Sequence, residues 1–293
     1  MAQASRQHSS GTALITGASS GIGLEFAALL AKQRYDLVLV ARNRSSLAAL
    51  AERLREEHAV RVDVFATDLS ISTSADQLFN ELQQQNIAVD VLINDAGFAM
   101  QGEFAENDKA NLFDMLQVNI VALTQLTRAF LPGMVRRGHG RILNLGSIGS
   151  FMPGPLMAAY FASKAYVLSF SEALANELKG TGVTVTALCP GPTRTKFAHR
   201  ARLIDTKAFR GTLMEAADVA REGYEAMMKG KTVLITGFKM RMQMLPTPLV
   251  PRRWLAVFAR QYHETAAARK EPSTTNLPWT SSADEPQPSH VAH

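Results

Sequence analysis

Residues 13–23 read ALITGASSGIG and lead directly into a helical pattern, LEFAALLAKQ. The apolar start is typical of a short buried strand, and Gly17, Gly21 and Gly23 form the turn after it. Glycines let the backbone approach a ligand closely, while the start of the next helix presents free amide groups and a positive dipole end to phosphate. A strand before the turn and a helix after it therefore favour a pyrophosphate-binding turn over an ordinary loop.

The rest of the chain alternates between strand-like and helix-like segments. Further apolar runs typical of strands lie at residues 36–42, 60–70, 89–97, 141–147, 183–195 and 232–237. Helical patterns separate them, such as residues 45–58, where leucines recur at helical spacing opposite charged residues. This alternation predicts an α/β fold with a doubly wound, Rossmann-type parallel sheet of about seven strands. Such sheets bind ligands at the carboxyl ends of their strands, so we expect the site at that edge.

The composition is that of one globular domain. Of 293 residues 46% are hydrophobic and 19% charged, which is enough for one large core. The single cysteine, Cys189, excludes an internal disulfide, and the seven histidines lack metal-ligand spacing, so we predict no metal site. The formal charge of +5 is not gathered into a nucleic-acid module. The first ten residues lack the apolar core of a signal peptide and no apolar run reaches 18 residues, so we expect a cytoplasmic protein.

Tyr160 and Lys164 form the most suggestive pair of reactive side chains. They are four residues apart in the helical segment 156–179, so both should project from one face of a helix. An ammonium beside a phenol favours the phenolate and lowers the tyrosine pKa from its ordinary value of about 10. A tyrosine with a lowered pKa would serve as a general acid or base. Taken alone, such a pair is more often a solvated helix face.

The choice of cofactor is indicated by Arg42 at the end of the second strand. In dinucleotide folds this position, about 20 residues after the glycines, lies near the adenosine ribose. An acidic residue there would repel a 2′-phosphate, whereas a guanidinium attracts one. The sequence therefore favours NADP(H) over NAD, with Arg44 as a further basic contact. The alternative is a surface arginine at the entry of a helix.

Small and polar residues follow the other strands. Asp68 and Leu69 end the third strand, where an adenine could lie, and Asn94, Ala96 and Gly97 end the fourth. An ordinary turn would look the same at the fourth strand. Asn119 stands among apolar neighbours of a helical segment, and a buried amide without partners costs about 1 to 3 kcal/mol. It is either a structural hydrogen-bonding group or part of a polar relay, and its spacing does not decide between them.

These motifs together resemble the short-chain dehydrogenase/reductase family, in its shorter single-domain branch, over roughly residues 12–240. The motifs that carry the resemblance are TGASSGIG at 16–23, Asn94-x-Ala-Gly, the isolated Asn119, Ser147 thirteen residues before Tyr160-x-x-x-Lys164, and Pro190-Gly191. The chain departs from the family's usual pattern at Asp95, where an asparagine is expected, and at Gly146, where a serine is expected. Neither departure removes a catalytic group, and both concern the fourth strand and the shape of the pocket.

The resemblance implies a role for each catalytic position. Tyr160 would exchange a proton with the oxygen of a carbonyl substrate, and Ser147 would hydrogen-bond the same oxygen. Lys164 would lower the tyrosine pKa and hold the nicotinamide ribose. Asn119 would fix a water that links Lys164 to solvent. The family also implies a homodimer or homotetramer.

The resemblance also implies which residues bind the cofactor. The diphosphate would be bound by Thr16, Gly17, Ser19, Ser20, Gly21, Ile22 and Gly23. The adenosine side would be bound by Arg42, Asp68, Leu69, Asn94, Ala96 and Gly97. The nicotinamide would be bound by Tyr160, Lys164, Pro190, Gly191, Thr193 and Thr195.

The expected activity is an NADP(H)-dependent hydride transfer to or from a carbonyl or secondary alcohol. Apolar residues near the site in sequence suggest a hydrophobic substrate, although each could be core filling instead; they are Phe98, Met100, Met152, Pro153, Met157 and Phe197. Residues 195–217 are interpreted as a substrate lid. One alternative is a 3-oxoacyl reductase of lipid metabolism. Another is a non-catalytic regulator that senses NADP(H), which the intact set of Ser147, Tyr160 and Lys164 argues against.

The ends of the chain differ from its main body. We predict a flexible N-terminus at 1–11, the Rossmann-fold domain at 12–240, a basic amphipathic extension at 241–270 and a disordered tail at 271–293. Apolar residues recur at helical spacing beside arginines in the extension; they are Trp254, Val257, Phe258 and Tyr262 with Arg252, Arg253 and Arg260. This pattern is typical of peripheral membrane contact. Packing on the same chain or on a second subunit would produce it equally well.

Overall fold

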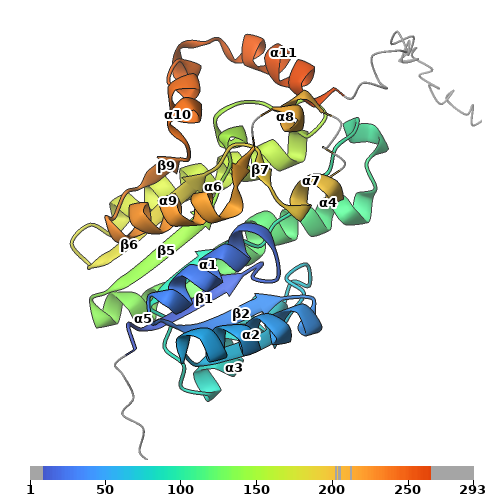
Figure 1. Cartoon of the computed structure of the whole chain (residues 1–293). Coiled ribbons are helices and arrows are strands. Elements are labelled where there is room, and N and C mark those ends of the chain that lie inside the picture. The colour runs from blue at the N-terminus through green and yellow to red at the C-terminus, as the bar shows by residue number, and fades with distance from the viewer. Residues whose placement is uncertain (1–8, 202, 204–205, 212, 265–293) are drawn as a thin grey trace, which may run out of the picture.

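The computed structural model describes residues 9–264 apart from 202, 204, 205 and 212 (Figure 1). Its main sheet has seven parallel strands in the order β3-β2-β1-β4-β5-β6-β9. The strands are β1 (Thr12–Thr16), β2 (Asp36–Ala41), β3 (Val62–Ala66), β4 (Val91–Asn94), β5 (Gly140–Leu145), β6 (Val183–Cys189) and β9 (Val233–Ile235). The predicted doubly wound sheet is confirmed. The predicted tail at 271–293 and most of the predicted flexible N-terminus lie outside the described residues.

Helices cover both faces of the sheet because successive strand side chains point to opposite sides. In β1, Ala13 and Ile15 face one layer and Leu14 faces the other. The first layer is formed by α1 (Gly21–Lys32), α2 (Arg44–His58) and α9 (Ala216–Met228). The second is formed by α3 (Ser74–Gln84), α5 (Leu123–Arg137) and α6 (Ala158–Glu177). Two apolar cores result, one on each face.

The chain reverses its direction of travel across the sheet between β1 and β4. From β1 it adds β2 and β3 on one side, and from β4 it adds β5, β6 and β9 on the other. Adjacent helices therefore diverge at this point and leave a crevice beyond the carboxyl ends of the strands. This crevice is where the sequence predicts the site.

A long helical segment precedes β5 and contains an irregular turn. It runs from α4 (Lys109–Leu116) through the π-helical turn η2 (Gln117–Ala122) into α5. By length and mean hydropathy, Lys109–Arg137 is one described helix that could cross a membrane. In this fold it packs on the sheet, where Leu126, Phe130 and Met134 are buried. The sequence did not indicate the π-helical turn, which carries Asn119.

Short elements follow β4, β5 and β6 and lie above the carboxyl edge. They are η1 (Phe104–Glu106), η3 (Ile148–Phe151), β7 (Thr193–Arg194), α7 (Lys196–Arg200), α8 (Lys207–Arg210) and β8 (Met214–Glu215). After β9 the chain forms α10 (Phe238–Met244), η4 (Thr247–Leu249) and α11 (Arg252–His263), which stand beyond the sheet at the top of Figure 1. The predicted domain boundary at residue 240 falls inside α10.

Candidate active site

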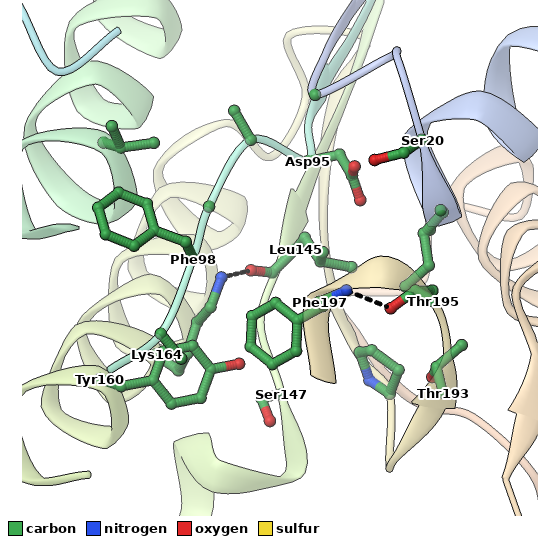
Figure 2. Close-up of a pocket in the computed structure, with 18 of the residues that line it drawn as sticks. Ser20, Asp95, Phe98, Leu145, Ser147, Tyr160, Lys164, Thr193, Thr195 and Phe197 are labelled. Carbon is green, nitrogen blue, oxygen red and sulfur yellow. Dashed lines mark hydrogen bonds between the residues drawn. The ribbon is translucent and has the colours of Figure 1, made fainter. Parts of the chain in front are cut away.

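A cavity of about 660 Å³ opens at the carboxyl edge of the sheet. Figure 2 shows its centre, where Ser147, Tyr160 and Lys164 lie together. The predicted site residues that line it are Gly17, Ser19, Ser20, Gly21, Ile22, Arg42, Asp68, Leu69, Ala96, Gly97, Ser147, Tyr160, Lys164, Pro190, Gly191, Thr193 and Thr195. The predicted site residues that do not line it are Thr16, Gly23, Asn94 and Asn119.

The glycine turn has the geometry that a diphosphate requires. Gly17 and Gly21 have φ angles of 71° and 62°, a region that side chains disfavour. A Cβ atom on Gly21 would lie 3.2 Å from the Thr195 side chain across the cavity. Ser20 stands at the N-cap of α1 without capping it through its side chain, so the N-terminus of α1 can present amides to an anion. These features fit a dinucleotide cofactor.

Thr16 and Asn94, two of the predicted cofactor residues, lie behind the cavity wall and support it. Thr16 Oγ1 accepts hydrogen bonds from the backbone amides of Asp95 at 3.1 Å and Ala96 at 3.0 Å, which holds the segment after β4 against β1. Asn94 is buried, and its Nδ2 donates to Thr127 Oγ1 at 3.1 Å and to Asn144 Oδ1 at 2.9 Å. Neither side chain reaches the cavity, because both hold neighbouring strands together.

Asn119 uses its amide to join three segments. Its Oδ1 accepts from the backbone amide of Phe98 at 3.1 Å, and its Nδ2 donates to the carbonyl of Phe98 at 3.0 Å and to Ser163 Oγ at 3.1 Å. The π-helical turn directs this side chain toward the segment after β4 and toward α6. The sequence left open whether Asn119 is a structural hydrogen-bonding group or part of a polar relay. These contacts support the structural role. The water-fixing role implied by the family stays a prediction.

Tyr160 and Lys164 project from one face of α6 into the cavity, as their spacing predicts. The Lys164 ammonium donates a hydrogen bond to the Leu145 carbonyl at 2.7 Å, drawn as a dashed line in Figure 2. It lies 5.9 Å from the centre of the Tyr160 ring. The helix therefore holds a phenol and an amine side by side, with the amine anchored to the end of β5.

The expected lowering of the Tyr160 pKa is wrong for this structure. Burial raises the pKa of Tyr160 to about 12, and the hydrogen bond from Ser147 offsets only part of that rise. The reason is that the phenol lies among apolar side chains while the Lys164 ammonium is directed toward the Leu145 carbonyl. Burial in turn lowers the pKa of Lys164 to about 8. At neutral pH Tyr160 is therefore a neutral phenol, which is the form that can donate a proton.

Asp95 is a cavity residue that the sequence analysis noted only as a departure from the family pattern. Its Oδ2 lies 2.9 Å and 2.6 Å from the positions that Cβ atoms on Gly17 and Gly23 would occupy. Its Oδ1 is buried without a hydrogen-bond partner among the described residues. Burial raises the pKa of Asp95 to about 7, against the opposing effects of the Lys164 ammonium and the Gly23 amide. The aspartate at a position where the family usually has asparagine was the sequence signal that could have identified Asp95 as a cavity residue.

The two ends of the cavity differ in polarity. At the polar end, Arg42 lines the wall after β2, and Asp68 Oδ1 accepts from Ser70 at 3.0 Å through its amide and 2.8 Å through its hydroxyl. Arg44 begins α2, is exposed and does not line the cavity. Its expected contact with the 2′-phosphate receives no support from this position.

The opposite end is apolar and partly built by distant segments. Of the predicted substrate residues, Phe98, Met157 and Phe197 line the cavity, with the rings of Phe197 and Tyr160 5.7 Å apart between centroids (Figure 2). Met100 and Met152 pack behind this wall. The predicted lid contributes Leu203 and Phe209. Other residues also line the cavity and were not indicated by the sequence; they are Phe161, Asn111, Asp114 and His263.

Comparison with known proteins identifies the family. The model of the short chain dehydrogenase family matches residues 11–204. Over 177 residues the chain is 37% identical to a very-long-chain 3-oxoacyl-CoA reductase of Phaeosphaeria nodorum, an alignment that covers 59% of this chain and 52% of that protein. The chain thus spans about half the length of the curated relative it matches.

Solved structures resemble the chain over a larger share of their length. A short-chain dehydrogenase from Sphingobium yanoikuyae in complex with NADPH is 34% identical, with a TM-score of 0.74, and the match covers 82% of this chain and 93% of that one. A short-chain dehydrogenase/reductase from Burkholderia phymatum in complex with NAD is 26% identical, with a TM-score of 0.73, over 80% of this chain and 92% of that one. The fold, the glycine turn and a family model that matches most of the chain agree: the protein belongs to the short-chain dehydrogenase family.

Proposed function

We propose that the protein is an NADP(H)-dependent oxidoreductase that interconverts a hydrophobic carbonyl compound and its secondary alcohol. The observation that carries this proposal is the meeting of Ser147, Tyr160 and Lys164 at the centre of one cavity. One end of that cavity has the glycine turn and the N-terminus of α1, and the other has an apolar wall. Such an arrangement suits a dinucleotide and an apolar substrate that meet at the phenol.

In the proposed reaction each side chain acts on the substrate oxygen or on the proton. The nicotinamide, when bound, supplies or accepts the hydride. The hydroxyls of Ser147 and Tyr160 donate hydrogen bonds to the carbonyl oxygen, and the proton of Tyr160 passes to that oxygen as the alcohol forms. The nearby Lys164 ammonium stabilises the phenolate that results. In the oxidative direction the phenolate takes the proton back.

The preference for NADP(H) rests on Arg42. Arg42 lines the cavity directly after β2, and the residues at that strand end include no carboxylate that would repel a 2′-phosphate. Related structures contain either NADPH or NAD, so the choice is made by local residues such as this one. Binding titrations with both reduced cofactors test the proposal, and equal affinities would contradict it.

A 3-oxoacyl reductase of lipid metabolism is the second candidate. It is favoured by the apolar wall around Phe98, Met157 and Phe197 and by the very-long-chain 3-oxoacyl-CoA reductase of Phaeosphaeria nodorum among the relatives. Oxidation of NADPH should be followed with 3-oxoacyl thioesters of increasing chain length and with simple hydrophobic ketones. A preference for long thioesters selects the second candidate, and a preference for ketones selects the first. Tight NADPH binding without turnover of any carbonyl would instead support a cofactor-sensing regulator.

The predicted homodimer or homotetramer and the cytoplasmic location belong to the same proposal. Light scattering on the eluting protein would measure the subunit number. A monomer across the whole concentration range would contradict the proposed assembly.

A further inference from the structure

The segment after β9 exposes far more apolar surface than the rest of the described chain. Eight of the fifteen exposed large apolar side chains among the described residues lie between residues 238 and 262. Leu249 and Phe238 are 86% and 76% exposed, and Trp254 and Phe258 are each more than half exposed. Single exposed apolar residues need no explanation, but such a concentration marks an interaction surface.

In α11 the apolar residues form two separate faces. Leu255 and Ala259 are buried and point toward the domain. Trp254, Val257 and Phe258 lie on another face and are exposed to solvent. The inner face accounts for the attachment of the helix, and about half of each of these three outer side chains remains open to solvent.

The same segment carries only positive charge. Residues 238–263 contain five lysines and arginines and no aspartate or glutamate. Arg260 already pairs with Glu103 at 3.0 Å and with Glu264 at 3.2 Å. Arg241 lies 4.0 Å from Glu222. Lys239, Arg252 and Arg253 supply the rest of the charge, and Arg253 stands beside the exposed ring of Trp254.

The position of the two arginines in α11 is unfavourable for the isolated helix. Arg252 and Arg253 occupy its first turn, which has no acidic residue and no side-chain cap. Cations destabilise a helix N-terminus, whereas an anion there would satisfy both the free amides and the guanidinium groups. The charge of this turn is therefore complementary to an anionic surface.

We propose that α10 and α11 dock on an anionic lipid surface through their exposed apolar side chains. The apolar side chains would enter the interface between head groups and acyl chains, and the arginines would contact the head groups. A second copy of this chain fits less well, because a twofold interface on this face would bring Arg252 and Arg253 of both copies together. The proposal does not depend on the proposed enzymatic activity.

Docking in this way would place the substrate end of the cavity near the lipid. His263, the last residue of α11, lines the cavity, and its ring lies 5.1 Å from that of Phe161 between centroids. Its carbonyl accepts a hydrogen bond from Gln101 Nε2 at 2.5 Å. The helix that carries the outer face is thus attached directly to the cavity wall.

Vesicle flotation with the full-length protein tests the proposal. We expect the protein to float with phosphatidylcholine vesicles that contain about one-third phosphatidylglycerol, and to float less at high salt. The pair Trp254→Ser and Phe258→Ser should weaken partitioning at least about ten-fold, because two aromatic side chains no longer enter the lipid. The pair Arg252→Gln and Arg253→Gln should weaken it by about ten- to thirty-fold. Ile71→Ser, which removes an equally exposed apolar residue distant in sequence, is the matched control.

Four outcomes would overturn the proposal. The first is wild-type protein that stays below the anionic vesicles, and the second is a Trp254→Ser and Phe258→Ser variant that floats as the wild type does. The third is a dimer in sedimentation that this pair of substitutions abolishes, without vesicle binding, since the occupant would then be a second copy. Vesicle binding that appears only after removal of residues 265–293 would assign the face to that segment instead.

Discussion

The centre of the cavity and the outer face of α11 depart in opposite directions from the usual distribution of residues. In the cavity, Asp95 and Lys164 are ionisable groups inside the protein. On α11, Trp254 and Phe258 are large apolar groups outside it. The first arrangement shifts pKa values and therefore has consequences for proton transfer, whereas the second leaves the folded domain almost unaffected. Ionisable groups inside a protein therefore indicate chemistry, and large apolar groups on its surface indicate a partner.

Of the substitutions that test this contrast between the cavity and α11, Tyr160→Phe is expected to have the largest effect. The variant keeps the ring but removes the proton, so kcat should fall by about a hundred- to ten-thousand-fold. Thermal unfolding should show that the variant is folded. Tyr166→Phe is the matched control, because Tyr166 lies on the same helix and bonds Thr124 at 3.0 Å outside the cavity. Normal turnover by Tyr160→Phe would remove the proposed proton donor.

Next in size is the effect of pH on Asp95. Its pKa is about 7 in the folded protein against 3.8 as the ordinary value, so between these values the folded state holds a proton that the unfolded state has lost. The free energy of unfolding should therefore fall as pH rises from about 4 to 7, by up to about 4 kcal/mol, and level off above. Asp95→Asn should abolish this fall and be more stable than the wild type at pH 8.

Urea unfolding of the wild type and Asp95→Asn across this pH range would measure the difference. Asp114→Asn removes an exposed carboxyl from the same cavity wall and serves as the control. Parallel stability profiles for the wild type and Asp95→Asn would show that the buried carboxyl does not take up the proton.

A smaller effect is expected at the polar end of the cavity. Arg42→Asp replaces a charge-assisted contact with a repulsive one, so the preference for NADPH over NADH should fall by about ten- to a hundred-fold. Arg44→Asp makes the same charge change outside the cavity and should alter the preference much less. Ratios of kcat/KM for the two cofactors would measure both. Equal responses of the two variants would mean that net charge, and not the cavity wall, selects the cofactor.

The smallest effect is expected on the outer face of α11. Trp254→Ser should change the free energy of unfolding by no more than about 0.5 kcal/mol, because the side chain is exposed. Leu255→Ala, one position further on the inner face, should cost about 2 kcal/mol because it empties a buried site. Chemical denaturation of both variants would test the contrast. A large loss for Trp254→Ser would show that the outer face packs within the chain.

Much of the fold could be predicted because its signals are local. The short apolar runs located the strands to within a few residues, since β2, β4 and β5 end at Ala41, Asn94 and Leu145. The parallel arrangement of the sheet follows from the alternation of strand and helix. The sequence could not show whether Asn94 and Asn119 line the cavity or support its wall from behind. Both are polar residues among apolar neighbours, and only their partners on other elements show that they hold the wall in place.

The strand and helix pattern, the glycine turn and the shared helix face of Tyr160 and Lys164 could all be inferred from residues close together along the chain. Only the tertiary structure decided the direction of the Tyr160 pKa, the contact of Asp95 with two glycines and the closure of the cavity by His263. The physical reason is that desolvation and packing depend on groups brought together from distant segments. A spacing rule can show which way a side chain points, but not what surrounds it.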